Sequence, residues 1–185
     1  MELERRVVLK GAALSGLVFT LDGVAVALSP RQARADNIPL TILTHAEQES
    51  LEALGEVLLP GAKEAGIANY VDHQLGVPPG EALLVARSMN VPPPFVNFYR
   101  AGLKALDAAA QKSQSAGFAA MPPAQQVDFV RAMMKQNPDG WAGPPSPFFY
   151  AVVRMDAIDV VYGTVEGFAR LGVPYMPHIL PQRSW

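Results

Sequence analysis

The stretch that most constrains the fold is FFYAVVRMDAIDVVYG, residues 148–163, which reads as a helix with almost no polar face. At 100° per residue, Arg154 lies nearly opposite Asp156 and Asp159, and apolar side chains fill most of the other positions. A helix that is apolar nearly all round is buried on most sides. We therefore expect helix 148–162 to lie at the centre of this domain, or between this domain's core and another subunit.

The rest of the chain also has helical periodicity, interrupted by prolines. Thr44 and Glu47 have the spacing of a capping box, and a proline pair or triplet precedes two later helices. Helices are expected at 45–58, 66–75, 95–113, 124–136 and 148–162, with short helical pieces at 81–89 and up to Phe168. In helix 124–136, the inward residues should be Val127, Val130 and Met134. Since no stretch shows strand alternation between turn signals, we predict an all-α fold of five or six helices with proline-rich connections and an extended C-terminal arm.

The first 35 residues have the three parts of a secretory signal. A short charged start precedes an apolar stretch at 11–28, and Ala33-Arg34-Ala35 follows as a small-residue cleavage site. Asp22 in the middle of the apolar stretch argues against a membrane-spanning helix. We predict a signal peptide over residues 1–35 and a helical domain over 36–173.

The charged start resembles the twin-arginine export signal, which carries folded cargo. Four residues match its pattern: Arg5, Arg6, Leu9 and Lys10. Glu4 and Val8 stand where the pattern usually has a hydroxyl residue and phenylalanine. The alternatives are an ordinary signal with two chance arginines, or a retained N-terminal anchor.

Composition excludes several classes of site. The chain has no cysteine, which removes disulfides, thiolate metal sites, iron–sulfur clusters and covalent haem. The net charge is −2 and no basic patch dominates, so nucleic acid is not an expected partner. No dinucleotide or phosphate-binding motif indicates a cofactor bound by this chain. The export signal therefore suggests that a folded partner travels with it.

The C-terminal residues 174–185, PYMPHILPQRSW, form the predicted arm. Three prolines forbid a regular helix, and an extended apolar strip cannot build a core of its own. The arm must lie in a groove of this chain or of a partner, and its residue types are those enriched at interfaces. The predicted partner interface comprises Phe149, Tyr162, Phe168, Tyr175, Met176, His178, Ile179, Leu180 and Trp185.

Two polar pairs in the first half of the domain are candidates for a metal-binding or reactive site. His45 and Glu49 lie four residues apart on one helical face, but no third metal ligand is near in sequence. Asp72 and His73 are adjacent, so on a helix they point apart, and we expect them to be solvated. Neither pair predicts a metal site.

Further candidates lie toward the C-terminus. Asp156 and Asp159 could form a carboxylate pair for acid–base chemistry, but we expect them to form ion pairs with a neighbouring basic group. His178 could reach from the arm into a partner's site. No serine lies in a G-x-S-x-G turn. We therefore predict no catalytic, cofactor-binding or metal-binding residue, and no enzyme activity of the chain alone.

Three longer stretches are similar to a known family. They are TxxExxxLxALGEVLLPGAKEAGIANYVDHQL from Thr44, FxxFYRAGLKALD from Phe95, and FFYAVVRMDAIDVVYGTVEGFARLGVPYMPHILP from Phe148. Together with the twin-arginine leader, they resemble the gluconate 2-dehydrogenase subunit 3 family over essentially the whole chain after the leader. These are pattern similarities without a mechanism of their own, and they supply no catalytic residue.

The resemblance implies a small accessory subunit in a periplasmic dehydrogenase complex that oxidises sugars, sugar acids or polyols. The catalytic partner would be an FAD-containing flavoprotein of the glucose–methanol–choline type, and a multihaem cytochrome c subunit often joins it. The small subunit would stabilise the flavoprotein and escort it through the twin-arginine translocase to the periplasm or the periplasmic face of the inner membrane. Two alternatives remain: a stand-alone periplasmic helical binding module, and an enzyme that uses Asp156, Asp159 or His178.

Overall fold

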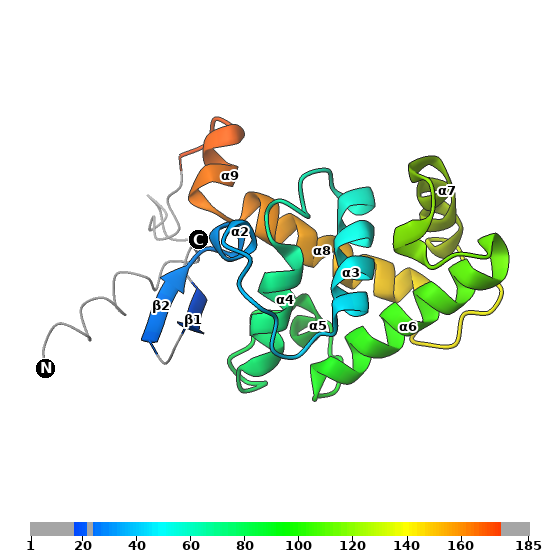
Figure 1. Ribbon diagram of the computed structural model, residues 1–185, viewed down its shortest axis with the longest axis horizontal. Coiled ribbons are helices and arrows are strands. Elements are labelled where there is room, and N and C mark those ends of the chain that lie inside the picture. The colour runs from blue at the N-terminus through cyan, green and yellow to red at the C-terminus, as the bar shows by residue number, and fades with distance from the viewer. Residues whose placement is uncertain (1–16, 22–23, 175–185) are drawn as a thin grey trace, which may run out of the picture.

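The computed structural model describes residues 17–21 and 24–174. Figure 1 shows an elongated helical body with a small β-hairpin at the N-terminal end. In chain order the elements are β1 (Leu17–Leu21), β2 (Val24–Leu28), α2 (Pro30–Ala35), α3 (His45–Leu58), α4 (Ile67–Gly76), α5 (Val85–Ser88), α6 (Phe95–Gln114), the 3₁₀ helix η1 (Phe118–Ala120), α7 (Pro123–Met133), α8 (Ser146–Tyr162) and α9 (Val165–Arg170).

Helix α8 is the centre of the fold. It contacts α3, α4, α5 and α7 along its length and α9 at its end, and Figure 1 shows it running through the body along the long axis. Phe149, Val152, Val153 and Ala157 have no exposed surface. The expectation that this nearly all-apolar helix is buried on most sides by this domain is thus confirmed.

The all-α class is confirmed, since the described residues hold eight α-helices and a two-stranded sheet. This number of helices exceeds the five or six expected because α2, α5 and α9 are only four to six residues long. Helices this short depend on tertiary contacts rather than on intrinsic propensity, so they leave a weak sequence pattern. None of the helices described is long and apolar enough to cross a membrane.

The predicted helix starts agree with the structure. Thr44 caps α3 through a capping box in which its side chain accepts from the Glu47 N–H and the Glu47 side chain accepts from the Thr44 N–H. Pro123 lies in the first turn of α7, and α6 begins directly after Pro94. Proline fits these positions because the first turn of a helix needs no N–H donor there.

The buried face of α7 differs from the expected one. Val130 is buried as predicted, but Val127 is 37 % and Met134 46 % exposed, so the prediction for these two was wrong. Phe129 and Met133 face the core instead, and Phe129 packs on Phe118 with ring centroids 5.7 Å apart. The aromatic contact with η1 sets the rotation of α7, and η1 was not foreseen from the sequence.

A β-hairpin occupies part of the stretch read as the apolar middle of a signal. β1 pairs with β2 in antiparallel register, with Leu17 opposite Leu28 and Leu21 opposite Val24. The intervening sequence, Asp22-Gly23, is a pair favoured in two-residue hairpin turns. This hairpin was not expected from the sequence, in which Asp22 was taken only as an argument against a membrane-spanning helix.

An aromatic cluster closes the core where α6 crosses α8. The Phe98 ring lies 5.6 Å from the rings of both Phe148 and Phe149, and the Trp141 ring lies 6.1 Å from Phe149. The two helices approach closely at Gly102, where an added Cβ would meet the Phe149 ring at 2.2 Å. Only glycine permits this approach, so Gly102 fixes the crossing of the two helices.

Candidate functional site

The predicted site residues at the two ends of the chain lie mostly outside the described residues. This holds for the export-signal residues Arg5, Arg6, Leu9 and Lys10. It also holds for the arm residues Tyr175, Met176, His178, Ile179, Leu180 and Trp185. Of the predicted interface, the structure therefore places Phe149, Tyr162 and Phe168.

These three residues do not form one surface. Phe149 is fully buried beneath α6, in the aromatic cluster described above. Tyr162 ends α8 and is half-buried, and Phe168 lies half-buried on α9. The described part of the predicted interface is thus limited to the junction between α8 and α9.

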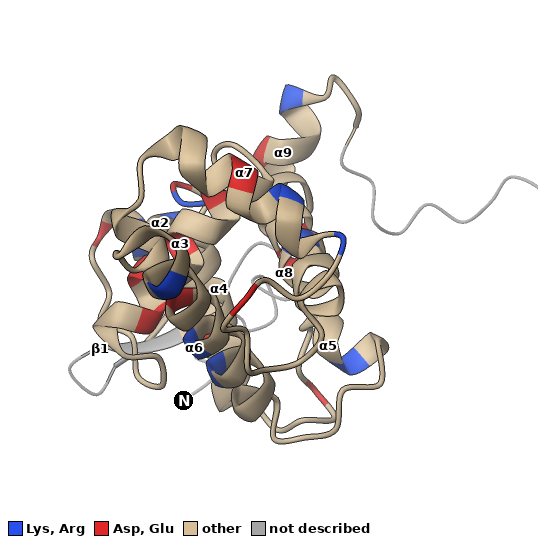
Figure 2. Ribbon diagram, turned by 90° about the vertical axis from the view of Figure 1, so that its right-hand side faces the viewer, with Lys and Arg blue, Asp and Glu red and all other residues tan. Residues whose placement is uncertain are grey.

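Helix α9 projects from the body at this junction, as Figures 1 and 2 show in two directions at right angles. Its close approach to α8 depends on Gly167, whose added Cβ would lie 2.4 Å from the Val161 carbonyl oxygen. Three apolar residues here are exposed, Val165 by 50 %, Leu171 by 56 % and Val173 by 48 %. We call Val165, Leu171 and Val173 the α9 surface.

The α9 surface leads directly into the predicted arm. Val173 and Pro174 are the last described residues, both exposed, and the apolar sequence continues from Tyr175. Isolated exposed apolar residues are ordinary on a protein surface, and these three are distinguished by leading into the apolar sequence that follows them. Sequence reasoning missed this surface, because before the arm it selected only Phe149, Tyr162 and Phe168.

The most unusual polar group in the described residues is Asp156, on α8 and without exposed surface. Its carboxylate accepts a hydrogen bond from the Tyr99 hydroxyl of α6 at 2.6 Å and from the Val85 N–H of α5 at 3.1 Å. The expected ion pair with a basic group was wrong for Asp156. Its partners come from residues far away in sequence, which no local spacing could reveal.

Burial controls the protonation of this group. Burial raises the pKa of Asp156 to about 7, although its hydrogen bonds from Tyr99 and Val85 act in the opposite direction. Burial and the Asp156 charge also raise the pKa of Tyr99 well above its ordinary value, and burial raises the pKa of Asp159. Because Asp156 has no exposed surface, no substrate can reach it in this conformation, so the pair with Asp159 is not arranged for acid–base catalysis.

Asp72 is also a buried carboxylate, and its expected solvation was wrong. It is 4 % exposed and accepts hydrogen bonds from the N–H groups of Thr41, Ile42 and Leu43 at 2.7–2.8 Å. Its neighbour His73 points elsewhere, with Nε2 3.0 Å from the Val18 carbonyl oxygen. Asp72 therefore fixes the loop before α3 on α4.

No metal site emerges from the described side chains. His45 and Glu49 approach within 3.7 Å, but their side chains are 82 % and 59 % exposed. No group of three or more histidine or acidic residues in the described part of the chain could hold a metal ion. Metal ions in proteins usually need at least three protein ligands.

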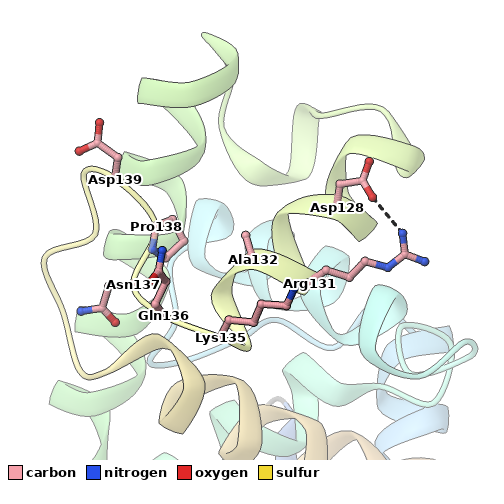
Figure 3. A pocket seen from close by; sticks show the side chains of 8 residues that line it. All are labelled: Asp128, Arg131, Ala132, Lys135, Gln136, Asn137, Pro138 and Asp139. Carbon is pink, nitrogen blue, oxygen red and sulfur yellow. Dashed lines mark hydrogen bonds and ion pairs between the residues drawn. The ribbon is translucent and has the colours of Figure 1, made fainter.

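A hollow of about 490 Å³ lies between α7 and the loop after it. Figure 3 shows the side chains that line it. Asp128, Arg131 and Lys135 come from α7 and its end, and Asp139 comes from the loop. Arg131 pairs with Asp128 at 3.0 Å, and Lys112 pairs with Asp139 at 2.8 Å, lowering the pKa of Asp139. All of these charges are exposed, and Asp128, Arg131 and Asp139 are paired, so the hollow offers no buried polar group to fix a ligand.

The comparison with protein families identifies a matching family. The family model described as gluconate 2-dehydrogenase subunit 3 matches residues 45–178. This range includes α3 to α9, and therefore Asp72, Asp156 and the α9 surface. No curated protein and no solved structure matches the chain.

Proposed function

The chain belongs to the gluconate 2-dehydrogenase subunit 3 family, and from this membership we propose that it is the non-catalytic small subunit of an FAD-dependent dehydrogenase complex. The catalytic partner is a flavoprotein of the glucose–methanol–choline type that oxidises a sugar, sugar acid or polyol. A multihaem cytochrome c subunit can complete the complex. In this proposal, the partner binds FAD and this chain binds no cofactor.

The observation that carries the proposal is the α9 surface. Val165, Leu171 and Val173 expose apolar side chains on an element that contacts little besides α8, immediately before an apolar, proline-rich arm. Covering such residues stabilises a complex because it removes apolar area from water, by about 25 cal/mol per Å². The proposed contact therefore runs from α9 into residues 174–185.

Export completes the proposed role. Arg5 and Arg6 provide a twin-arginine signal that acts for the folded, FAD-loaded partner as well as for this chain. The complex then works in the periplasm or on the periplasmic face of the inner membrane. Export of a folded partner would explain why a chain with no cofactor motif carries an export signal.

The test is co-purification of the tagged full chain from its native host, read by mass spectrometry and by flavin absorbance. Replacing Leu171 and Val173 together by aspartate should reduce the recovered flavoprotein at least tenfold, because it places two charges in an apolar contact. The matched control replaces Val127 and Met134 by aspartate, since these are also exposed apolar residues but lie on α7, at the opposite end of the long axis (Figure 1).

Each result has a defined meaning. Equal recovery with both double variants would show that the contact lies elsewhere on the chain. Absence of any flavin-containing partner would contradict the proposed role, and a stable colourless monomer would favour a stand-alone binding module. Turnover by the pure chain without flavin would favour an enzyme.

A further inference from the structure

The predicted cleavage site lies within helix α2, which packs against the rest of the domain. Ser29 caps the helix through a capping box with Gln32, with distances of 3.2 Å and 2.8 Å. The predicted site, Ala33-Arg34-Ala35, forms the last turn, and Ala33 has no exposed surface. The small residues that suit a signal peptidase are therefore helical, and one of them is buried.

Arg34 also pairs with a buried acid of the domain. Its Nε lies 3.0 Å from Oε1 of Glu52 on α3, and the Glu52 side chain is only 5 % exposed. Lys63 lies 3.5 Å from the same carboxylate and Gln48 donates to it at 3.0 Å. Without Arg34, the Glu52 carboxylate would keep only Lys63, which is farther away, and the Gln48 amide as its partners. This is unfavourable for a buried charge.

The start of α2 lies directly against the start of α4. Gly66 caps α4 with φ +82°, and an added Cβ would stand 2.1 Å from the Pro30 carbonyl oxygen. The Ile38 N–H donates to the Ala33 carbonyl at 2.9 Å, which joins α2 to the segment that follows it. α2 is thus packed on the domain from its first residue to its last turn.

We propose that α2 remains part of the folded domain after export, and that its packing shields the peptide bond after Ala35 from signal peptidase. The proposal rests on the proposed export role. A protease cleaves a folded segment through its locally opened state, and the contacts of α2 reduce the population of that state. Since a twin-arginine passenger folds before export, the peptidase meets the packed helix, and the exported chain keeps residues 29–35.

The first experiment measures the N-terminus of the exported protein. The full chain, produced with its partners in the native host, is recovered from the periplasm and its mass is measured. A mass that includes Ser29 to Ala35 supports the proposal, whether or not residues before Ser29 are removed. A mature chain that begins at Asp36 overturns it.

The second experiment tests the packing of α2 without relying on export. Trypsin can cut after Arg34, and in the full chain this cut should be slow. Gly66→Ala should accelerate the cut at least tenfold, because its Cβ collides with Pro30. Gly61→Ala is the matched control, since Gly61 has φ +92° but nothing within 4 Å of an added Cβ.

The two variants share the backbone strain of a positive φ and differ in the collision with α2. Cleavage after Arg100, an exposed residue of the long helix α6, reports general unfolding and should stay unchanged in both. Fast cleavage after Arg34 in the unmodified chain, or equal acceleration in both variants, would overturn the proposal. If the chain is not exported at all, the proposed function fails while this second result still decides whether α2 is docked.

Discussion

The loop before α3 and the middle of α8 each depend on one buried carboxyl group, and the protein surrounds the two groups differently. Asp72 is 4 % exposed and accepts three backbone N–H bonds and one from the Thr41 hydroxyl at 3.2 Å. Asp156 is 0 % exposed and accepts one N–H and one phenol hydroxyl. The number of donors, rather than the depth of burial, separates them.

This difference assigns different roles to the two regions. The donors of Asp72 replace the water that it loses, so its main effect is to hold the 41–43 segment on α4. Asp156 has fewer donors, and desolvation dominates, so its pKa rises to about 7. The first region should respond mainly to loss of hydrogen bonds, and the second mainly to pH.

The largest expected effect is the pH dependence due to Asp156. The pKa of Asp156 in the folded state, about 7, lies above its ordinary value of 3.8. The stability that the protonated Asp156 contributes to the folded state is therefore fully present below about pH 4 and is lost as the pH rises through 7. The loss amounts to about 4 kcal/mol at most. Asp156→Asn should remove this slope, measured as the difference in unfolding free energy between the two proteins from pH 4 to 7.5. If the unfolding free energies of the two proteins changed with pH in parallel, the predicted role of Asp156 would be contradicted.

Asp72→Ala should cost about 3 kcal/mol, because the N–H groups of Thr41, Ile42 and Leu43 lose their acceptor together. Urea unfolding at one pH measures the loss. Asp139→Ala is the control, since that side chain is 82 % exposed and its ion pair is with exposed Lys112. Its loss should be much smaller than that of Asp72→Ala, because solvent screens an exposed ion pair. Equal losses would show that burial and hydrogen bonding of Asp72 do not matter.

Tyr99→Phe should cost about 1–2 kcal/mol at pH 7 by removing one donor to Asp156. Because that hydrogen bond lowers the pKa of Asp156, its loss should also move the midpoint of the pH dependence upward. Tyr70→Phe is the matched control, since the Tyr70 hydroxyl donates to the Leu83 carbonyl. It should weaken the fold without moving the midpoint. A shift of the same size in both variants would refute the assignment.

Thr41→Val should have the smallest effect, about 0.5 kcal/mol, because Asp72 keeps its three N–H donors when the hydroxyl is removed. The same urea titration measures it. A loss approaching that of Asp72→Ala would mean that the hydroxyl, and not the backbone, holds the loop.

Local signals in the sequence predicted the helices well. The capping box at Thr44 and the prolines at the starts of α6 and α7 each act within a few residues, so spacing alone reveals them. The central position of α8 followed from its lack of a polar face. Structural features that depend on residues far apart in the sequence were not predicted. They include the rotation of α7 and the hydrogen bonds of Asp72 and Asp156.

The candidate site was less predictable than the fold. Phe149 was chosen for the interface as an aromatic residue, but it fills the space beside Gly102 in the core. Leu171 and Val173 were not chosen, although they are exposed, because an aliphatic residue in sequence gives no sign of whether something covers it. α2 shows the same limit, since a peptidase motif and a docked helix share the letters Ala-Arg-Ala.

The place of α8 in the chain also sets the timing of folding. α3 and α6 are synthesised first, but α8, which contacts α3, α4, α5 and α7, leaves the ribosome later. At about 5–20 residues per second, α3 waits roughly 5–20 s for α8. The core therefore closes only after α8 has emerged, and during that interval the apolar faces of α3 and α6 are open to chaperones and proteases.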